Sequence, residues 1–444
     1  MIIKRLNQYI LYFTAFTFIA LFIFQGCSVN PVTGKKELSL MSESMENNTG
    51  AEYYPVYTQI SNGEYPDANL QSYISSIGLK MAKLTHRPNL NYEFNVVNSS
   101  IPNAYAIPGG KISITRGLLV KMTNEDQVAA VIGHELGHVN ARHTASQYTK
   151  TILTQAVLLG ASYYLDKKKV KHGELYLAAG SAGMQLMLLK YSRDHERQAD
   201  ELGLQYMTGA GYNPAAFVDV MKIINSLNDK EPSKWEVMLS THPLTSERIN
   251  DAQKRVDSIY SQMVSRRLSV QNFNSNVSVL KNNMNAYDRF DKGTAFLEEK
   301  KYDEAEKYFL EAIRLHKNDS LFYSNLANAR FGKKDYSSAR QYASQAVLMN
   351  GKLFLNNYMK GISETELRNY ASSINDLKNA NSLIENHPVV IFYLAKSYDG
   401  AGNKSEALAY YKKTLELTDD EEIVNYAVQR LNSLDPNWNV KTNS

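Results

Sequence analysis

A period of 34 residues in the C-terminal third most constrains how this chain of 444 residues can fold. Small residues recur at this spacing, without any insertion, in two series: Gly293, Ala327, Gly361 and Ala395, and Ala305, Ala339, Ser373 and Ala407. Ala312, Ala346, Ala380 and Thr414 form a third series. Small side chains are needed where two helices approach closely, so the period predicts a stack of helix pairs.

This period resembles the tetratricopeptide (TPR) repeat, a helix-turn-helix unit. The resemblance implies an α-solenoid of TPR helix pairs over residues 286–434, with a tail at 435–444. The repeats are predicted at residues 286–319, 320–353, 354–387 and 388–421, with a capping helix at 422–434. Such an array has a concave surface suited to peptides or partner proteins, and it supplies no chemistry.

A second motif, His134-Glu-Leu-Gly-His138, follows a stretch that begins with a capping residue, Asn124, and early acids, which predicts a helix. Residues four apart lie on one face of a helix, so His134 and His138 can bind one Zn²⁺. A water bound to zinc has a pKa of roughly 7, and Glu135 can accept its proton. The motif predicts a zinc hydrolase with one zinc ion per chain.

A zinc hydrolase also needs a third protein ligand and one open position. His143 comes five residues after the second motif histidine, with Ala141 where a metzincin has glycine, so we interpret His143 as a structural or surface residue. Glu196 and Asp200 lie four apart on another predicted helix, where Glu196 can ligate zinc and Asp200 can orient a histidine ligand. Two exposed helix acids explain this pattern equally well. His195 is about 100° away round that helix and is interpreted as structural or exposed.

Four motifs in order resemble the zinc metallopeptidase family that includes the CaaX prenyl proteases, HtpX and the BepA-like exported lipoproteins. They lie at residues 103–110, 133–143, 192–200 and 241–248. The resemblance implies that His134, His138 and Glu196 are the zinc ligands. It also implies that Glu135 is the catalytic base and that Asp200 orients a ligand. The implied fold is mainly α, a helical metallopeptidase domain with a small β-sheet beside the active-site helix.

The apolar runs at residues 152–165 and 175–189 are shorter than the roughly 20 residues of a membrane span. We interpret them as buried helices or as a hairpin that caps the active site, which favours the exported branch of the family without spanning helices. The metallopeptidase domain is then expected at residues 28–263, followed by a linker at 264–285.

His242 and Arg248 follow the predicted ligands. Three interpretations of His242 remain open: a hydrogen-bond donor to the tetrahedral oxyanion, a ligand that fills the open position of zinc until substrate displaces it, or a cap of the helix predicted near Thr245. Arg248 can pair with an acid or with a substrate carbonyl, and a structural salt bridge is an equal alternative.

Residues 111–115 alternate in polarity after a Pro-Gly-Gly turn, which predicts a β-strand with Lys111, Ser113 and Thr115 on one face. Because this strand comes directly before the zinc helix, we expect it to bind extended substrate by β-augmentation. An ordinary hairpin strand is the alternative.

Residues 1–27 are predicted to export the chain, since Lys4 and Arg5 precede a mostly apolar run at 10–24. Cys27 resembles the lipidated cysteine of a bacterial lipobox, which implies a lipid anchor, most simply in the outer membrane. A plain signal peptide and an uncleaved anchor are the alternatives. Cys27 is the sole cysteine, so no disulfide framework or cysteine metal site is expected.

The net charge of +4 argues against a nucleic-acid partner. The sequence thus predicts a zinc-dependent endopeptidase on the periplasmic side of the bacterial envelope. It would degrade misfolded or misassembled proteins, with repeats that bind polypeptide substrates or partner proteins. The alternative is a periplasmic chaperone or assembly factor that acts through the repeats and has latent protease activity.

Overall fold

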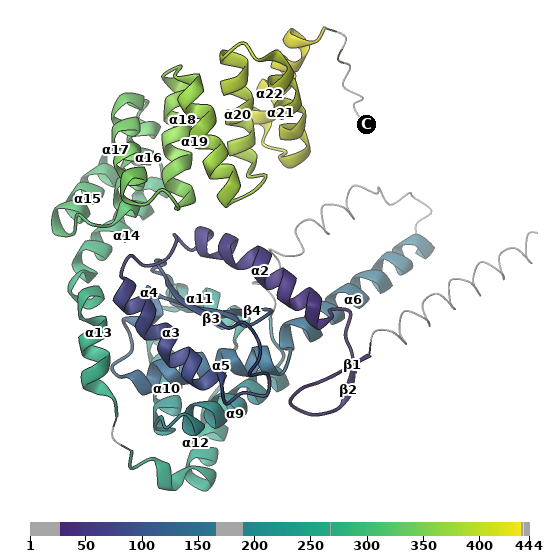
Figure 1. Ribbon diagram of the computed structural model, residues 1–444, viewed down its shortest axis with the longest axis vertical. Helices are drawn as coiled ribbons and strands as arrows, with labels where there is room; N and C mark the ends of the chain where they lie inside the picture. The colour runs from purple at the N-terminus through teal and green to yellow at the C-terminus, as the bar shows by residue number, and fades with distance from the viewer. Residues whose placement is uncertain (1–26, 166–189, 267, 437, 439–444) are drawn as a thin grey trace, which may run out of the picture. The chain divides into compact units, whose positions relative to one another are not determined.

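The computed structural model describes residues 27–165, 190–266, 268–436 and 438 (Figure 1). Residues 1–26 of the predicted export segment and the second apolar run, at 175–189, lie outside these residues. The chain divides into two compact units, Met1–Tyr54 with Asp67–Val277 and Pro55–Pro66 with Ser278–Ser444. Within the described parts, none of the helices has the length and apolar character needed to cross a membrane.

The first unit is mainly helical. Its helices are α2 (Glu43–Ile60, which continues into the second unit), α3 (Ala68–Ala82), α4 (Arg116–Leu119), α5 (Glu125–Asn140), α6 (His143–Leu165), α9 (Arg193–Gly209), α10 (Ala215–Lys230), α11 (Pro232–Thr241) and α12 (Ser246–Ile259), with a 3₁₀ turn at Ser261–Met263. The first predicted apolar run, at 152–165, forms the second half of α6.

A three-stranded sheet lies in this unit, with strand order β3 (Glu93–Val97), β5 (Lys111–Thr115), β4 (Ala104–Ile107). Strand β5 pairs in parallel with β3 and antiparallel with β4. A separate hairpin joins β1 (Cys27–Val29) and β2 (Lys36–Leu38).

The prediction that substrate adds to residues 111–115 is wrong, because β5 is the middle strand and both of its edges are paired. The three predicted substrate-binding side chains are buried. Lys111 pairs with Glu93, Ser113 donates to Asn95, and Thr115 donates to the Asn103 carbonyl. They stabilise the sheet rather than offer a surface to a peptide.

The predicted zinc helix α5 begins at Glu125, and its N-cap Asn124 accepts a hydrogen bond from the backbone of Gln127 at 2.9 Å. It packs closely on α9 because small residues line the contact. A Cβ at Gly137 would lie 2.7 Å from the Ala199 carbonyl oxygen. Gly133 and Gly203 form a second close contact one turn along, where a Cβ at Gly133 would lie 2.9 Å from the Gly203 carbonyl oxygen. This close packing brings side chains of α5 and α9 on either side of the contact near enough to interact directly.

Residues 264–285, predicted as a linker, contain helix α13 (Val270–Asn282). The stretch before this helix is bound to the start of α5. Asp126 accepts hydrogen bonds from the backbone N–H groups of Ser269 and Asn213, both at 2.8 Å. The Asn213 side chain donates in turn to the carbonyl of Arg266 at 2.7 Å.

The second unit confirms the predicted α-solenoid, with four helix pairs and a final helix (Figure 1). Each predicted unit of 34 residues is one helix pair. The helices are α14 (Met284–Glu298), α15 (Tyr302–Leu315), α16 (Ser320–Gly332), α17 (Tyr336–Met349), α18 (Phe354–Glu366), α19 (Tyr370–Leu383), α20 (Pro388–Gly400), α21 (Lys404–Leu417) and α22 (Glu421–Leu434).

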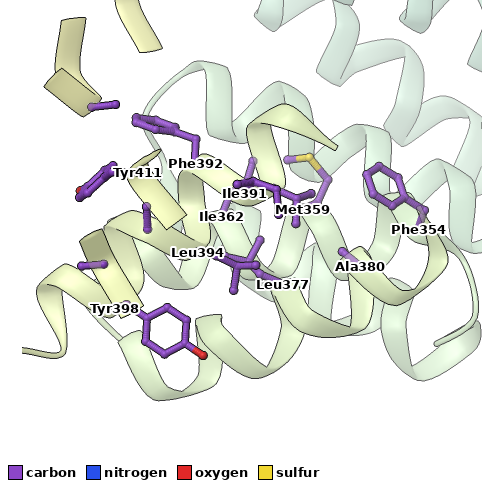
Figure 2. Close-up of a cluster of buried hydrophobic side chains, with 14 of the residues drawn as sticks. Phe354, Met359, Ile362, Leu377, Ala380, Ile391, Phe392, Leu394, Tyr398 and Tyr411 are labelled. Carbon is purple, nitrogen blue, oxygen red and sulfur yellow. The ribbon is translucent and has the colours of Figure 1, made fainter. Parts of the chain in front are cut away.

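Packing explains the period. Ala327 and Ala395 are fully buried, and a Cβ at Gly361 would lie 2.6 Å from the Leu377 side chain. Large apolar side chains fill the space between successive pairs. Figure 2 shows this core around Met359, Ile362, Leu377, Ile391 and Leu394.

The segment Pro55–Pro66 belongs to the second unit, which differs from the predicted domain boundaries. Gln59 donates to the Lys352 carbonyl at 2.9 Å and accepts from the Phe354 N–H at 2.8 Å. The Tyr65 ring lies 5.9 Å from the Tyr287 ring. This segment has no counterpart in the repeat period, so the period could not reveal it.

Candidate metal centre

Four candidate metal ligands from three separate segments gather in the first unit. His134 and His138 lie on α5, Glu196 lies on α9, and His242 ends α11, with their ligand atoms all within 4.8 Å of one another. The Nε2 atoms of the two α5 histidines are 3.1 Å apart. This spacing suits one ion with bonds of about 2 Å, and two imidazoles with a carboxylate are a donor set that zinc prefers.

Glu196 is fully buried, at 0 % exposure, and lies at the middle of this cluster. Its Oε1 is 3.4 Å from His138 Nε2 and 3.2 Å from His242 Nδ1, and its Oε2 is 3.6 Å from His134 Nε2. Burial raises the pKa of Glu196, but His242 and the other two histidines lower it well below its usual value. Glu196 is therefore a carboxylate, the form that binds a metal.

Asp200 and Arg248 lie next to the ligands. Asp200 Oδ1 lies 3.0 Å from His134 Nδ1, and Arg248 pairs with both Asp200 oxygens, at 2.7 and 2.8 Å. Burial by itself lowers the pKa of His134, but hydrogen bonds with Asp200 and Glu196 raise it to about 10. Arg248 also lies 2.6 Å from Glu196 and donates to the Pro243 carbonyl at 2.7 Å. Arg248 thus forms ion pairs with two acidic residues of this chain, Glu196 and Asp200.

The charges of the buried groups fit a divalent cation. Glu135, Glu196 and Asp200 are buried carboxylates, and Arg248 is the buried guanidinium that faces two of them. When the histidines are neutral and the three acids are ionised, as in a metal-bound site, three negative charges and one positive charge leave a balance of −2, and uncompensated buried charge is costly. In addition, Glu135 Oε2 is buried without a hydrogen-bond partner among the described residues. The site is therefore built for an ion of charge +2 and a further polar group beside Glu135.

His242 is buried against this cluster, with Nε2 4.0 Å from Glu135 Oε1. The interpretation of His242 as a cap of the helix near Thr245 is wrong, because Thr245 itself is the N-cap of α12 and its side chain accepts from the Arg248 N–H at 3.3 Å. The ligand and oxyanion-donor interpretations both remain compatible with this position.

Two neighbours of His138 were not assigned to the site by sequence reasoning. His143 is buried rather than on the surface, and its Nδ1 lies 3.0 Å from His138 Nδ1. Burial, followed by the charge of His195, lowers the pKa of His143 to about 3. The Tyr191 ring lies 4.0 Å from the His138 ring, and burial raises the pKa of Tyr191. The one sequence signal for Tyr191 is its place directly before Ser192, the N-cap of α9.

An apolar cavity of about 60 Å³ opens beside His134 and Glu135. Residues of α5, α10 and α11 form most of its walls. Its apolar lining includes Val131, Phe217, Met221, Ile224, Met238 and Leu244.

Comparison with known families agrees with this geometry. Residues 68–256 match the model of peptidase family M48, and residues 290–351 match a tetratricopeptide repeat model. The first match contains all of the residues that line the metal cluster.

Known relatives match part or most of the chain, and one match is long enough to include both regions. The chain is 26% identical over 401 residues to the beta-barrel assembly-enhancing protease of Escherichia coli (strain K12), a match that covers 85% of this chain and 74% of that protein. It is 29% identical over 195 residues to the protein of the same name from Yersinia pestis, covering 43% of this chain and 40% of that one. The mitochondrial metalloendopeptidase OMA1 of Schizosaccharomyces pombe is 27% identical over 230 residues, covering 50% of this chain and 65% of that protein.

Proposed function

We infer the function from the premise that this chain carries a zinc metallopeptidase domain of family M48, followed by tetratricopeptide repeats. We propose that it hydrolyses peptide bonds within misfolded or misassembled proteins of the bacterial cell envelope, on the periplasmic side. The repeats bind substrates or partner proteins. The observation that carries this proposal is the ligand cluster, with Glu135 buried beside it and one Glu135 oxygen unpartnered among the described residues.

The residues have distinct roles in this proposal. His134, His138 and Glu196 hold the zinc, which when bound polarises the scissile carbonyl and makes a water acidic. Glu135 accepts the proton of the attacking water at its free Oε2 and later returns it to the leaving amine. Asp200 orients His134, and Arg248 holds Asp200, Glu196 and the loop of His242 in place.

Extended substrate pairs with β4 in this proposal, rather than with β5. Strand β4 is an edge of the described sheet and packs against α5. Because Asn103 bonds to Thr115 across the strand pair, Ala104 and Ala106 direct their backbone groups to the outer side of β4. The substrate residue that comes directly after the scissile bond places its side chain in the cavity beside Glu135. Because this cavity is small and has apolar walls, a small apolar residue fits best there.

A lipid anchor at Cys27 is part of the proposal. Strand β1 begins at this residue, and the next residue, Ser28, accepts a hydrogen bond from Arg142 at 2.8 Å. Asn30 donates to the Ala141 carbonyl at 3.2 Å. A lipid on Cys27 thus holds the peptidase unit close to a membrane, and the outer membrane is the one we propose.

The decisive experiment compares the purified protein with its Glu135→Gln variant on an unfolded test protein. Both are expected to bind about one zinc ion, because Glu135 is a base rather than a ligand. Wild type should cleave, and the variant should lose at least about 100-fold in rate, in the range of general-base catalysis. Equal cleavage by both proteins would reject Glu135 as the base.

A second candidate function is an assembly factor with latent protease activity. His242 favours it, because its ring lies within the ligand cluster, where a fourth protein ligand would leave no open position. The two functions differ in a strain that lacks the protein: rescue by Glu135→Gln supports the assembly factor, and failure of rescue supports the peptidase.

A further inference from the structure

A continuous chain of polar side chains starts at His138 and runs away from the metal position. His138 Nδ1 lies 3.0 Å from His143 Nδ1, and His143 Nε2 lies 2.9 Å from Gln198 Oε1. Both histidines are 1 % exposed. Both contacts are within hydrogen-bond distance, so the three groups form one hydrogen-bonded chain.

The proton positions in this chain follow from the one atom that can only accept. The Gln198 Oε1 atom has no proton, so His143 Nε2 must donate to it. A neutral imidazole has a single N–H, which leaves His143 Nδ1 as an acceptor and His138 Nδ1 as its donor. His138 then has a bare Nε2, the nitrogen that faces His134 and Glu196 and that can bind a metal.

We propose that His143, held by Gln198, is a positioning residue that fixes His138 in the tautomer and ring orientation needed for metal binding. The inference rests on the proposed zinc site and goes beyond it. It gives a role to a residue that neither ligates the metal nor takes part in proton transfer. Residues that hold a histidine ligand tune the affinity for the metal.

The two histidine ligands are held by different chemistry. His134 Nδ1 faces the carboxylate of Asp200, which Arg248 neutralises in part. His138 donates instead to a neutral ring. A carboxylate partner raises the basicity of a histidine ligand, whereas a neutral acceptor fixes the tautomer with a smaller effect on basicity. The centre therefore combines one strongly basic imidazole with one that is mainly oriented.

A break between α5 and α6 brings His143 to this position. In an unbroken helix, a residue five places after His138 would lie about 140° away round the axis. Arg142 instead adopts φ 57, in the left-handed region, and its side chain bonds to Glu46, Ser28 and the Met41 carbonyl. The His195 ring stacks on His143 at 4.3 Å between centroids and supports it from the other side.

Nuclear magnetic resonance of ¹⁵N-labelled histidines in the zinc-loaded wild-type protein tests the proposal without any substitution. We expect the proton on Nδ1 in His138 and on Nε2 in His143. The opposite tautomer in either ring would overturn the proposal. No substrate is involved in this measurement, so a failure of the proposed peptidase activity leaves its result unaffected.

Zinc affinity, measured by competition with a chelating dye, provides the second test. His143→Ala is expected to weaken zinc binding by roughly 10- to 100-fold. His143→Asn, whose side-chain oxygen can accept at the place of Nδ1, should restore most of the affinity. His195→Ala is the matched control, since it removes the ring stacked on His143 but no member of the hydrogen-bonded chain, and it should weaken zinc binding less than His143→Ala does.

Wild-type affinity in a folded His143→Ala protein, or an equal loss in the alanine and asparagine variants, would overturn the proposal. If His143→Ala does not fold, the half-buried Gln198 replaces it as the target. Gln198→Ala removes the acceptor for His143 and should weaken zinc binding several-fold, and unchanged binding in that variant would count against the proposal equally.

Discussion

At the residue scale, charge balance decides what the centre can hold. Glu196 and Asp200 are buried carboxylates that share the guanidinium of Arg248, and in the described parts of the chain Glu135 has no cation as close. In the absence of a bound metal, His134 is the group best placed to take up positive charge, since its neighbouring carboxylates raise its pKa to about 10. Binding of a divalent ion replaces that proton, so zinc uptake should release a proton near neutral pH.

His242→Ala separates the two interpretations of this histidine that remain. Because its ring lies within the ligand cluster, we expect it to block the open position, and its removal should increase proteolysis of an unfolded protein several-fold. The measurement is the initial cleavage rate at saturating zinc, with Glu135→Gln as the inactive reference. A lower rate than wild type would instead identify His242 as a donor to the oxyanion, whose loss costs about 100-fold or more.

At the scale of elements, the contact between α5 and α9 sets the geometry of the site. Gly137→Ala should destabilise the protein by about 1–3 kcal/mol, because the added methyl group would lie 2.7 Å from the Ala199 carbonyl oxygen and force the helices apart. Zinc affinity should fall as well, since Glu196 moves with α9. Thermal unfolding and zinc titration check both effects.

The control for this substitution is Gly209→Ala, at the other end of α9. A Cβ there would lie 3.6 Å from Leu84, which is ordinary contact. This variant should keep wild-type zinc affinity and gain up to about 1 kcal/mol from helix propensity. Similar losses in both variants would show that the effect at Gly137 is not one of close packing.

The turns inside the repeats store a small strain. Lys300, Lys334 and Arg368 have φ of 59, 62 and 63°, and the fourth position in this series of 34 is Gly402, with φ 79°. Left-handed backbone costs a residue with a Cβ roughly 1–2 kcal/mol. Glycine alone avoids that cost, so the fourth turn is the relaxed one.

Lys334→Gly removes the cost of the left-handed backbone but increases the conformational entropy of the unfolded chain. The net expectation is a stabilisation of about 0.5–1 kcal/mol. The side chain of Lys334 is exposed, so little packing is lost. Gly402→Lys is the reciprocal variant, and it should destabilise by a similar amount because of the left-handed φ; no atom lies within 4 Å of its Cβ position, so no steric clash adds to this cost. Chemical denaturation measures both, and a change of the same sign in the two variants would contradict the explanation.

At the scale of the whole molecule, the proposed anchor decides where the peptidase acts. Cells that express the protein should incorporate radioactive palmitate into it, and Cys27→Ala should abolish this labelling, because Cys27 is the sole cysteine of the chain. The variant should fractionate away from membranes while the purified protein keeps its zinc affinity. Equal labelling of wild type and variant would reject the lipobox.

Much of this protein was predictable from periodicities that local geometry imposes. A period of 34 with small residues at fixed positions can be satisfied only by stacked helix pairs, and the four pairs are present. His134 and His138 share a helix face at a spacing of four. Glu196 and Asp200 share a face of a second helix at the same spacing. The resemblance to the metallopeptidase family predicted that these two pairs of residues belong to one site.

Tertiary structure decided the features that depend on strand order and on the break between two successive helices. Alternation predicted the strand at residues 111–115, but strand order alone makes β5 the middle of the sheet and leaves β4 at the edge. Sequence reasoning excluded His143 as a metzincin-type ligand because of its spacing of five, and only the break in the helix at the left-handed Arg142 brings its ring beside His138. Hydrogen bonds between distant segments carry no periodic signal, and so His143, Tyr191 and the place of His242 came from the fold.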